Sequence, residues 1–290
     1  MNSPLIYIVM ANYNGYPITA EAIASLKKLS YSNFKIVVVD DCSKDDSMEQ
    51  FRRHNQNEII LLQNAVNSGL CTTYNTGIKR ALQDGADYVF IVQNDTKDFS
   101  VNYLEEVIKK FESDTTIGMV GSIIYNGAGE MNWAETKTKF GFPLDISEGL
   151  VIKAEVFKTI GLLNEKLKVY FEDLDFIIRM RAAGYRTAKV THISFVHYGQ
   201  RTFSKQRFLP HFIRVRNVPL FMRRYCKQQS FAWKLRHYQR YMRVHIQSLL
   251  KALKRWDLVS ACALFNAVLI GTLVGLFTPW SDELEHGYHN

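Results

Sequence analysis

The first 92 residues of the chain alternate between short, continuous apolar runs and segments with helical periodicity. The apolar runs predict strands at residues 5–11, 35–39, 59–62 and 88–92. The helical patterns lie between them, at residues 22–29, 45–54 and 70–83. A strand that is apolar at every position is buried on both faces, which is typical of a parallel sheet covered by helices. We therefore expect an α/β fold with a mostly parallel sheet flanked by helices.

Each predicted strand is followed by a cluster of polar residues. The four clusters are Asn12 and Asn14, Asp40 and Asp41, Asn64 and Asn67, and Asn94 and Asp95. Asn and Asp are common turn residues after any strand. However, open α/β sheets bind their ligands outside the carboxyl ends of the strands, so four successive clusters favour a binding site there.

Three common motifs are absent from the sequence. The loop after the first strand lacks Gly-x-Gly-x-x-Gly, and neither Gly-x-x-x-x-Gly-Lys-Ser/Thr nor Gly-x-Ser-x-Gly occurs. These absences exclude the usual dinucleotide fingerprint, the phosphate loop and the nucleophile elbow. Carboxylates at strand ends without a glycine-rich cradle suit a site in which a divalent cation holds phosphate groups.

Composition and cysteine spacing bound the class of protein. The 290 residues are 47% hydrophobic and 22% charged, which allows one large domain with an appendage. The four cysteines form no pair at metal-binding or redox spacing, so we expect free thiols in a reducing compartment. The amino terminus lacks the charge and the apolar length of a signal peptide. We therefore expect a cytoplasmic location.

A cluster of carboxylates lies at the start of a predicted helix that ends at Gly184. Asp175 and Arg179 are spaced for an i,i+4 ion pair within this helix. Glu172 and Asp173 belong to its first turn, where the helix dipole favours an anion. Either these two residues cap the helix, or one of them is a general base that takes a proton from an acceptor hydroxyl.

Seven short motifs follow one another in a consistent order along the chain. They are Asn12-Tyr13-Asn14, Val37-Val38-Val39-Asp40-Asp41-x-Ser43, Asn67-x-Gly69, Asn75-x-Gly77, Asn94-Asp95, Glu172-Asp173-x-Asp175-x-x-x-Arg179 and His197. In this combination, over about residues 4–217, the chain resembles family 2 of the inverting glycosyltransferases. It is most similar to rhamnosyltransferase-like and galactofuranosyltransferase-like bacterial members that build surface polysaccharides. The resemblance implies a GT-A fold, a nucleoside diphosphate sugar donor and a divalent cation, Mn²⁺ or Mg²⁺.

The resemblance also implies which residues bind the donor. Asp40 matches the carboxylate that contacts the nucleotide base, and Asn12 and Asn67 match residues that line the same pocket. Asn94 and Asp95 complete this donor-binding set.

Metal ligands and a catalytic base follow from the same resemblance. Asp95 matches the last Asp of the metal-binding Asp-x-Asp motif, and His197 matches a histidine that completes the metal site in several relatives. A histidine that ends a strand is also often structural. Asp173 matches the catalytic base, with Glu172 beside it. The first position of Asp-x-Asp is the neutral Gln93, so we expect weak metal affinity.

Residues 141–149 resemble the segment that forms the acceptor side of the cleft. Trp133 and Phe142 either stack on a sugar ring there or pack as ordinary aromatic residues. The acceptor stays open between a glycan and a polyprenyl-linked oligosaccharide.

The positive charge of the chain is concentrated in one segment. Lys and Arg outnumber Asp and Glu by 36 to 28, and residues 198–256 carry 15 basic side chains and no acidic one. Apolar residues recur at helical spacing from Phe231 to Trp256, which predicts a basic amphipathic helix. A solvated face usually mixes signs, and no nucleic-acid recognition motif accompanies the charge. The three alternatives are a solvated face of a helix packed on the domain, a nucleic-acid patch and a helix on a membrane surface. We favour an anionic membrane surface as the partner, and not nucleic acid.

Residues 258–277 form an uncharged apolar stretch of 20 residues, long enough to span a bilayer. Polar residues and glycines interrupt it, so a helix that lies on the bilayer or packs on the domain is the alternative. Either arrangement would bring the 15 cations close to a lipid-linked pyrophosphate acceptor.

The resemblance therefore implies a GT-A domain in residues 1–217, and the charge and apolar patterns predict a basic, membrane-associating helical region in residues 218–290. The predicted function is inverting transfer of a sugar to a hydroxyl of a glycan or lipid-linked oligosaccharide, at the inner face of the bacterial cell membrane. One alternative is a non-catalytic nucleotide-sugar-binding module, in which Gln93 marks a lost metal site. The other is a sugar nucleotidyltransferase, which would be expected to carry a basic, glycine-containing loop after the first strand.

Overall fold

The computed structural model of the chain describes residues 3–55, 57–131, 136–137, 143–144, 149–199 and 208–279. The strands are β1 (Ile6–Asn12), β2 (Phe34–Asp40), β3 (Ile60–Gln63), β4 (Tyr88–Ile91), β5 (Thr96–Lys97), β6 (Ile117–Asn126), β7 (Thr136–Lys137), β8 (Pro143–Leu144), β9 (Leu150–Lys153) and β10 (Arg186–His197). The helices are α1 (Tyr16–Leu26), α2 (Ser47–His54), α3 (Leu70–Gln83), α4 (Tyr103–Glu112), α5 (Ala154–Ile160), a 3-10 turn (Glu165–Leu167), α6 (Glu172–Ala182), α7 (Leu209–Tyr225), α8 (Phe231–Lys254) and α9 (Leu258–Phe277).

The strands and helices predicted within the first 92 residues are confirmed, with ends that differ by a few residues. The largest difference is at α1, which begins at Tyr16, before the apolar pattern starts. Pro17 lies in its first turn, where the missing N–H costs no hydrogen bond and the fixed φ angle favours the helix.

Eight strands form one sheet in the order β3-β2-β1-β4-β9-β6-β10-β5. Four of the seven pairings are parallel, and β9 runs antiparallel to both β4 and β6. Because β9 reverses the direction on both sides, β4 and β6 point the same way. The carboxyl ends of β1, β2, β3, β4, β6 and β10 therefore share one edge of the sheet, which confirms the mostly parallel α/β arrangement.

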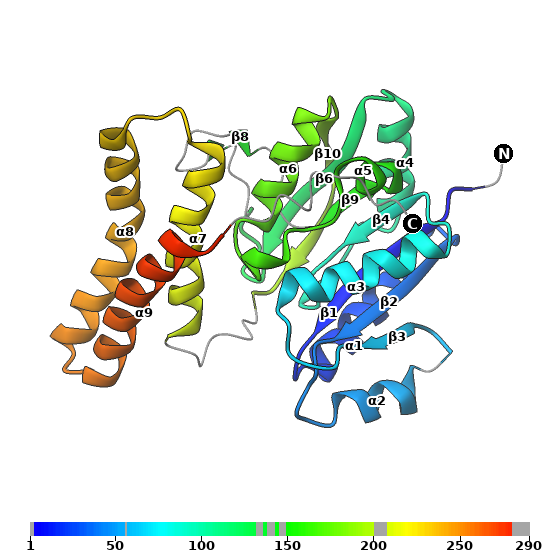
Figure 1. Ribbon diagram of the computed structural model, residues 1–290. Helices are drawn as coiled ribbons and strands as arrows, with labels where there is room; N and C mark the ends of the chain where they lie inside the picture. The colour runs from blue at the N-terminus through cyan, green and yellow to red at the C-terminus, as the bar shows by residue number, and fades with distance from the viewer. Residues whose placement is uncertain are drawn as a thin grey trace.

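Helices cover both faces of this sheet, as the apolar strands indicate (Figure 1). Along β1, Ile6, Ile8 and Met10 join one core with residues of α1, α2 and α4. Tyr7 and Val9 join the other core with residues of α3, α5 and α6. All five side chains are fully buried, so the body of β1 is closed to a ligand.

The helices α7, α8 and α9 form a bundle on the α6 side of the sheet (Figure 1). Val218 and Phe221 of α7 pack with Leu174 of α6 in one apolar cluster. The expected boundary between residues 217 and 218 falls inside α7, which is continuous from Leu209. The helix that contains this boundary packs on α6 on one side and on α9 on another.

Close contact joins α9 to α7. A Cβ atom at Gly271 would lie 2.9 Å from the carbonyl oxygen of Phe212, and one at Gly275 would collide with the carbonyl oxygen of Arg216. Small residues allow two helix backbones to approach in this way. By length and composition α9 is able to cross a membrane, with a mean hydropathy of 2.1, but one of its sides is packed on α7.

Candidate active site

Asn12 and Asp40 form a buried polar pair at the ends of β1 and β2. The Asn12 side-chain amide donates to Asp40 Oδ2 at 2.8 Å. The Ser43 backbone N–H donates to Asp40 Oδ1 at 2.8 Å, and the Ser43 hydroxyl donates to Oδ2 at 2.5 Å. Asp40 is fully buried. Direct contact between this carboxylate and a nucleotide base would therefore require Ser43 or Asn12 to move.

A chain of hydrogen bonds joins this pair to the end of β4. The Thr19 hydroxyl of α1 donates to Asn12 Oδ1 at 2.8 Å and accepts from the Asn94 amide at 2.9 Å. Thr19 is fully buried. The structure thus brings Asn12, Asp40 and Asn94 together, and Thr19, which belongs to no sequence motif, completes their network.

Asp41 holds the loop that follows β3. Its carboxylate accepts hydrogen bonds from the Asn64 side-chain amide and from the backbone N–H groups of Ser68 and Gly69, each at 2.9 Å. Asn67 is exposed in this loop. The carboxylate therefore fixes the loop against β2 and leaves Asn67 accessible.

Asp95 and His197 meet, although they are far apart in the sequence. β5 pairs antiparallel with the end of β10, with Thr96 opposite His197. This pairing places Asp95 Oδ1 3.1 Å from His197 Nε2. The two side chains predicted as metal ligands therefore lie side by side, next in sequence to Asn94 of the buried network.

The donor atoms at this point suit a divalent cation that is also bound by its substrate. Within the residues that the structure describes, no three His, Cys, Asp or Glu side chains converge on one point. Asp95 offers a carboxylate and His197 an imidazole, and Gln93 Oε1 is a buried acceptor with no hydrogen-bond partner in the described part of the chain. A cation with few protein ligands typically completes its shell with water and substrate phosphates, and the imidazole favours Mn²⁺ over Mg²⁺.

Glu172 and Asp173 begin α6, as the sequence predicts. The backbone N–H of Leu174 donates to Asp173 Oδ1 at 2.7 Å. Both acidic side chains are partly exposed. Asp173 is thus held on a rigid helix and accessible to a ligand, which a general base requires.

Asp175 has a structural place in α6. Its fully buried carboxylate lies 2.9 Å from Arg179 Nη2, which confirms the predicted ion pair. The Tyr225 hydroxyl of α7 donates to Asp175 Oδ1 at 2.5 Å, and Arg179 donates to the carbonyl oxygens of Ile160 and Leu162. Burial and the negative charge of Asp175 raise the pKa of Tyr225, so its hydroxyl stays a donor. No signal in the sequence indicates the contact with Tyr225.

The backbone directly before α6 is unusual. Lys168, Tyr170 and Phe171 have φ angles of 61°, 67° and 72°, a region that residues with side chains rarely adopt. The Lys168 carbonyl oxygen accepts a hydrogen bond from the Cys71 N–H of α3 at 2.9 Å. Such backbone persists where the surrounding contacts force it, and it is concentrated at functional sites.

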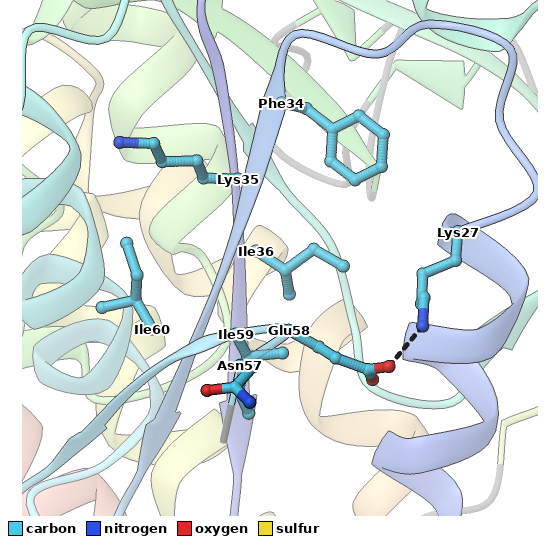
Figure 2. Close-up of a pocket in the computed structure, with 8 residues that line it drawn as sticks. All are labelled: Lys27, Phe34, Lys35, Ile36, Asn57, Glu58, Ile59 and Ile60. Atoms are coloured by element: carbon cyan, nitrogen blue, oxygen red, sulfur yellow. Dashed lines mark hydrogen bonds and ion pairs between the residues drawn. The ribbon is translucent and has the colours of Figure 1, made fainter. Parts of the chain in front are cut away.

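A cavity of about 510 Å³ lies away from this site (Figure 2). Its lining includes Phe34 and Ile60 at the starts of β2 and β3, and Figure 2 shows the Lys27–Glu58 ion pair beside it. Because Asp40 ends β2 whereas Phe34 begins it, the cavity belongs to the opposite edge of the sheet.

Most of the expected acceptor segment lies outside the described residues. Of residues 141–149, the structure describes 143, 144 and 149, and Trp133 and Phe142 are not among the described residues.

Comparison with known protein families identifies the α/β body. The model of the family described as glycosyl transferase family 2 matches residues 7–184, which is more than half of the chain. The chain belongs to glycosyl transferase family 2. The matched region contains Asn12, Asp40, Asp95 and Asp173, whereas His197 lies beyond it.

Several relatives of the chain are bacterial. It is 25% identical over 201 residues to the putative glycosyltransferase EpsE of Bacillus subtilis, covering 64% of this chain and 70% of EpsE. It is 26% identical over 211 residues to the dTDP-rhamnosyl transferase RfbF of Shigella flexneri, covering 68% of this chain and 70% of RfbF. With the uncharacterized protein y4gI of Sinorhizobium fredii it shares 24% identity over 260 residues, but it spans 28% of that protein's length.

Solved structures confirm the GT-A fold of this glycosyltransferase. The mannosyltransferase PcManGT from Pyrobaculum calidifontis, in complex with GDP-Man and Mn²⁺, superposes with a TM-score of 0.59 at 17% identity, covering 94% of this chain and 84% of PcManGT. TarS 1–349 of S. aureus in complex with UDP-GlcNAc gives a TM-score of 0.59 at 16% identity, covering 91% of this chain and 81% of that one. At these identities the similarity shows the fold alone.

Proposed function

We propose that the chain is an inverting glycosyltransferase that moves a sugar from a nucleoside diphosphate sugar to a hydroxyl of a glycan or polyprenyl-linked oligosaccharide. The observation that carries the proposal is the meeting of Asp95 and His197, 3.1 Å apart, beside Asn94. These side chains alone are too few to enclose a cation, and the diphosphate of a sugar donor supplies the missing oxygen ligands. Supporting this, PcManGT binds GDP-Man together with Mn²⁺.

The donor pocket is proposed at the ends of β1 and β2 and the loop after β3. Thr19 and Asp40 orient the Asn12 side chain. Asp40 is fully buried, so it shapes the base pocket through Ser43 while its own oxygens stay occupied. Asn67 is exposed in the neighbouring loop and is the polar side chain placed to reach the donor.

Asp173 is the proposed general base. Its carboxylate takes the proton of the acceptor hydroxyl while the hydroxyl oxygen attacks the anomeric carbon of the donor. The bond from that carbon to the diphosphate oxygen breaks, the electron pair leaves with the diphosphate, and the configuration at the carbon inverts. Glu172 adds a second carboxylate at the same helix turn. When bound at Asp95 and His197, a divalent cation would offset the negative charge of the diphosphate.

The donor is tested by incubating the purified chain with dTDP-rhamnose, UDP-GlcNAc and GDP-mannose and measuring the nucleoside diphosphate released. The similarity to RfbF makes dTDP-rhamnose the first donor to test. Asp173→Asn is expected to keep donor binding and to lower turnover by roughly 10²–10⁴-fold, the usual contribution of a general base. Glu172→Gln, one residue away on the same turn, is the matched control and is expected to have a smaller effect.

Three other outcomes would change the proposal. Unchanged turnover in Asp173→Asn removes this carboxylate from the mechanism. Donor binding without nucleotide release under any condition supports a non-catalytic binding module. Formation of a nucleoside diphosphate sugar from a nucleoside triphosphate and a sugar phosphate, with release of pyrophosphate, supports a nucleotidyltransferase.

We further propose that α8 and α9 place the enzyme on the inner face of the bacterial cell membrane, where it takes part in surface polysaccharide synthesis. Both helices expose large apolar side chains, including Phe231 at 80%, Trp256 at 85% and Phe277 at 79% exposure. Exposed cations such as Lys254 and Arg255 lie beside them. Because one side of α9 is packed on α7, we propose that α9 lies along the bilayer and does not cross it.

Vesicle flotation tests this placement on the full-length chain. The chain is expected to float with vesicles that contain phosphatidylglycerol and to stay unbound with phosphatidylcholine vesicles. Replacing Lys254 and Arg255 with Glu should weaken flotation, and Trp256→Ser should weaken it further. Equal binding to both vesicle types, unchanged by the substitutions, would contradict the membrane assignment.

A further inference from the structure

We infer that Arg216 and Asn217 of α7 are positioning residues that hold the backbone before α6 and thereby set the place of Asp173. The inference rests on the proposed role of Asp173 as the base. Asn217 is 0% exposed and Arg216 is 7% exposed, although both side chains are polar. Buried polar groups of this kind require hydrogen-bond partners, and theirs lie in a single loop.

The Asn217 side-chain amide faces three backbone carbonyls. Its Nδ2 lies 2.9 Å from the carbonyl oxygen of Leu167, 3.0 Å from that of Val169 and 2.9 Å from that of Tyr170. An amide carries two N–H groups, so three acceptors share two protons. One side chain therefore connects α7 to three backbone carbonyl groups of the segment that leads into α6.

Arg216 fixes the orientation of this amide. Its Nε and Nη2 donate to Asn217 Oδ1 at 3.0 and 2.7 Å, so the oxygen of the amide points to the guanidinium and the nitrogen to the loop. Arg216 Nη2 also donates to the carbonyl oxygen of Leu167 at 3.1 Å and to that of Lys166. The two residues therefore act on the loop as one unit.

The conformation of the backbone before α6 requires these hydrogen bonds. Lys168 has φ 61° and ψ −57°, and across it the Val169 N–H donates to the Leu167 carbonyl oxygen at 2.7 Å, which is the strained form of a three-residue turn. Phe171, at φ 72° and ψ −1°, directly precedes Glu172 and the first turn of α6. Without external hydrogen bonds these residues are expected to relax, and the relaxation would rotate the turn that carries the two carboxylates.

Asn217→Ala tests the inference through steady-state kinetics with dTDP-rhamnose, or with the other panel donor that the chain turns over. We expect kcat to fall by about 10-fold or more, since small misplacement of a catalytic group is costly. The KM for the donor should stay within about twofold, because the Asp41 carboxylate holds the loop after β3 independently of Asn217. Combining Asn217→Ala with Asp173→Asn should cause no further loss beyond Asp173→Asn alone, because both changes remove the same function.

Tyr103→Phe is the matched control. It removes a buried hydrogen bond of 2.9 Å to Ser122 in the core that contains residues of α1, α2 and α4, so it lowers stability without touching the loop before α6. Its kcat should equal that of the parent chain. Amide hydrogen exchange of residues 167–174 should rise in Asn217→Ala and stay unchanged in Tyr103→Phe. Arg216→Lys keeps the charge and loses the Nε hydrogen bond, and it should shift kcat and exchange in the same direction by a smaller amount.

The outcomes separate the inference from the proposed function. If Asp173→Asn is inactive while Asn217→Ala keeps parental kcat and parental exchange, the positioning role is overturned. Losses that multiply in the double variant overturn it as well, because they show independent effects. If Asp173→Asn turns over normally, the proposed base fails, and the exchange of residues 167–174 still decides whether Asn217 holds the loop.

Discussion

Loss of the Asp175 carboxylate is expected to destabilise the fold strongly. The side chain is 0% exposed, and its two oxygens accept hydrogen bonds from Arg179 and Tyr225. Removing one partner of a buried ion pair costs about 3–5 kcal/mol. In Asp175→Ala, Arg179 keeps its hydrogen bonds to the carbonyl oxygens of Ile160 and Leu162, which partly compensate for the lost carboxylate. We therefore expect a loss of about 3 kcal/mol in the free energy of unfolding, at the lower end of that range.

Urea unfolding followed by circular dichroism measures this loss by linear extrapolation. Tyr225→Phe removes one hydrogen bond to the same carboxylate and should cost about 1.5–3 kcal/mol. The double variant should lose less than the sum, because both changes remove one shared contact. A stability within about 0.5 kcal/mol of the parent would refute the reasoning, since surface substitutions have effects of that size. Lost turnover at unchanged stability would instead make Asp175 a site residue.

Three further outcomes follow from the structure. EDTA should suppress turnover and Mn²⁺ should restore it, but not in Asp95→Ala; full activity in chelator would show that no cation is needed. Gly275→Val should lower the free energy of unfolding by about 1–3 kcal/mol and loosen α9, because the new side chain meets the Arg216 carbonyl oxygen. An unchanged unfolding midpoint would contradict this packing. Burial lowers the pKa of His211, whose Nδ1 lies 2.8 Å from that of His245. Stability from His211 is therefore complete above about pH 6.5, the usual value for an unfolded histidine. This stability is lost as the pH falls through the lowered pKa of His211 in the folded protein. When thermal unfolding is measured from pH 8 to 5, His211→Gln should reduce the fall in unfolding temperature at acid pH.

Sequence patterns predicted the elements that depend on neighbours a few residues away. Continuous apolar runs were sufficient for β1 to β4, and the Asp175–Arg179 spacing was sufficient for the ion pair on α6. The short β9 was not predicted, although its antiparallel insertion between β4 and β6 aligns the end of β10 with the first four strands. Its place in the sheet depends on pairing with strands far away in the sequence.

Long-range contacts also decided which polar residues are open to a ligand. Asp40 and Asp173 are both motif carboxylates, yet Asp40 is enclosed by Asn12 and Ser43 while Asp173 is partly exposed. Nothing near Asp40 in the chain indicates that Asn12 occupies its second oxygen, because this hydrogen bond depends on the register of β1 against β2.

The sequence by itself determined that polar side chains collect at one edge of an α/β sheet and that two carboxylates begin a helix. It determined this because periodicity and helix capping are local properties of the chain. The tertiary structure decided that His197 lies beside Asp95 and that Asn217 forms hydrogen bonds with the backbone before Asp173. These contacts arise when β10 pairs with β5 and when α7 packs on α6, and each joins segments that no local pattern connects.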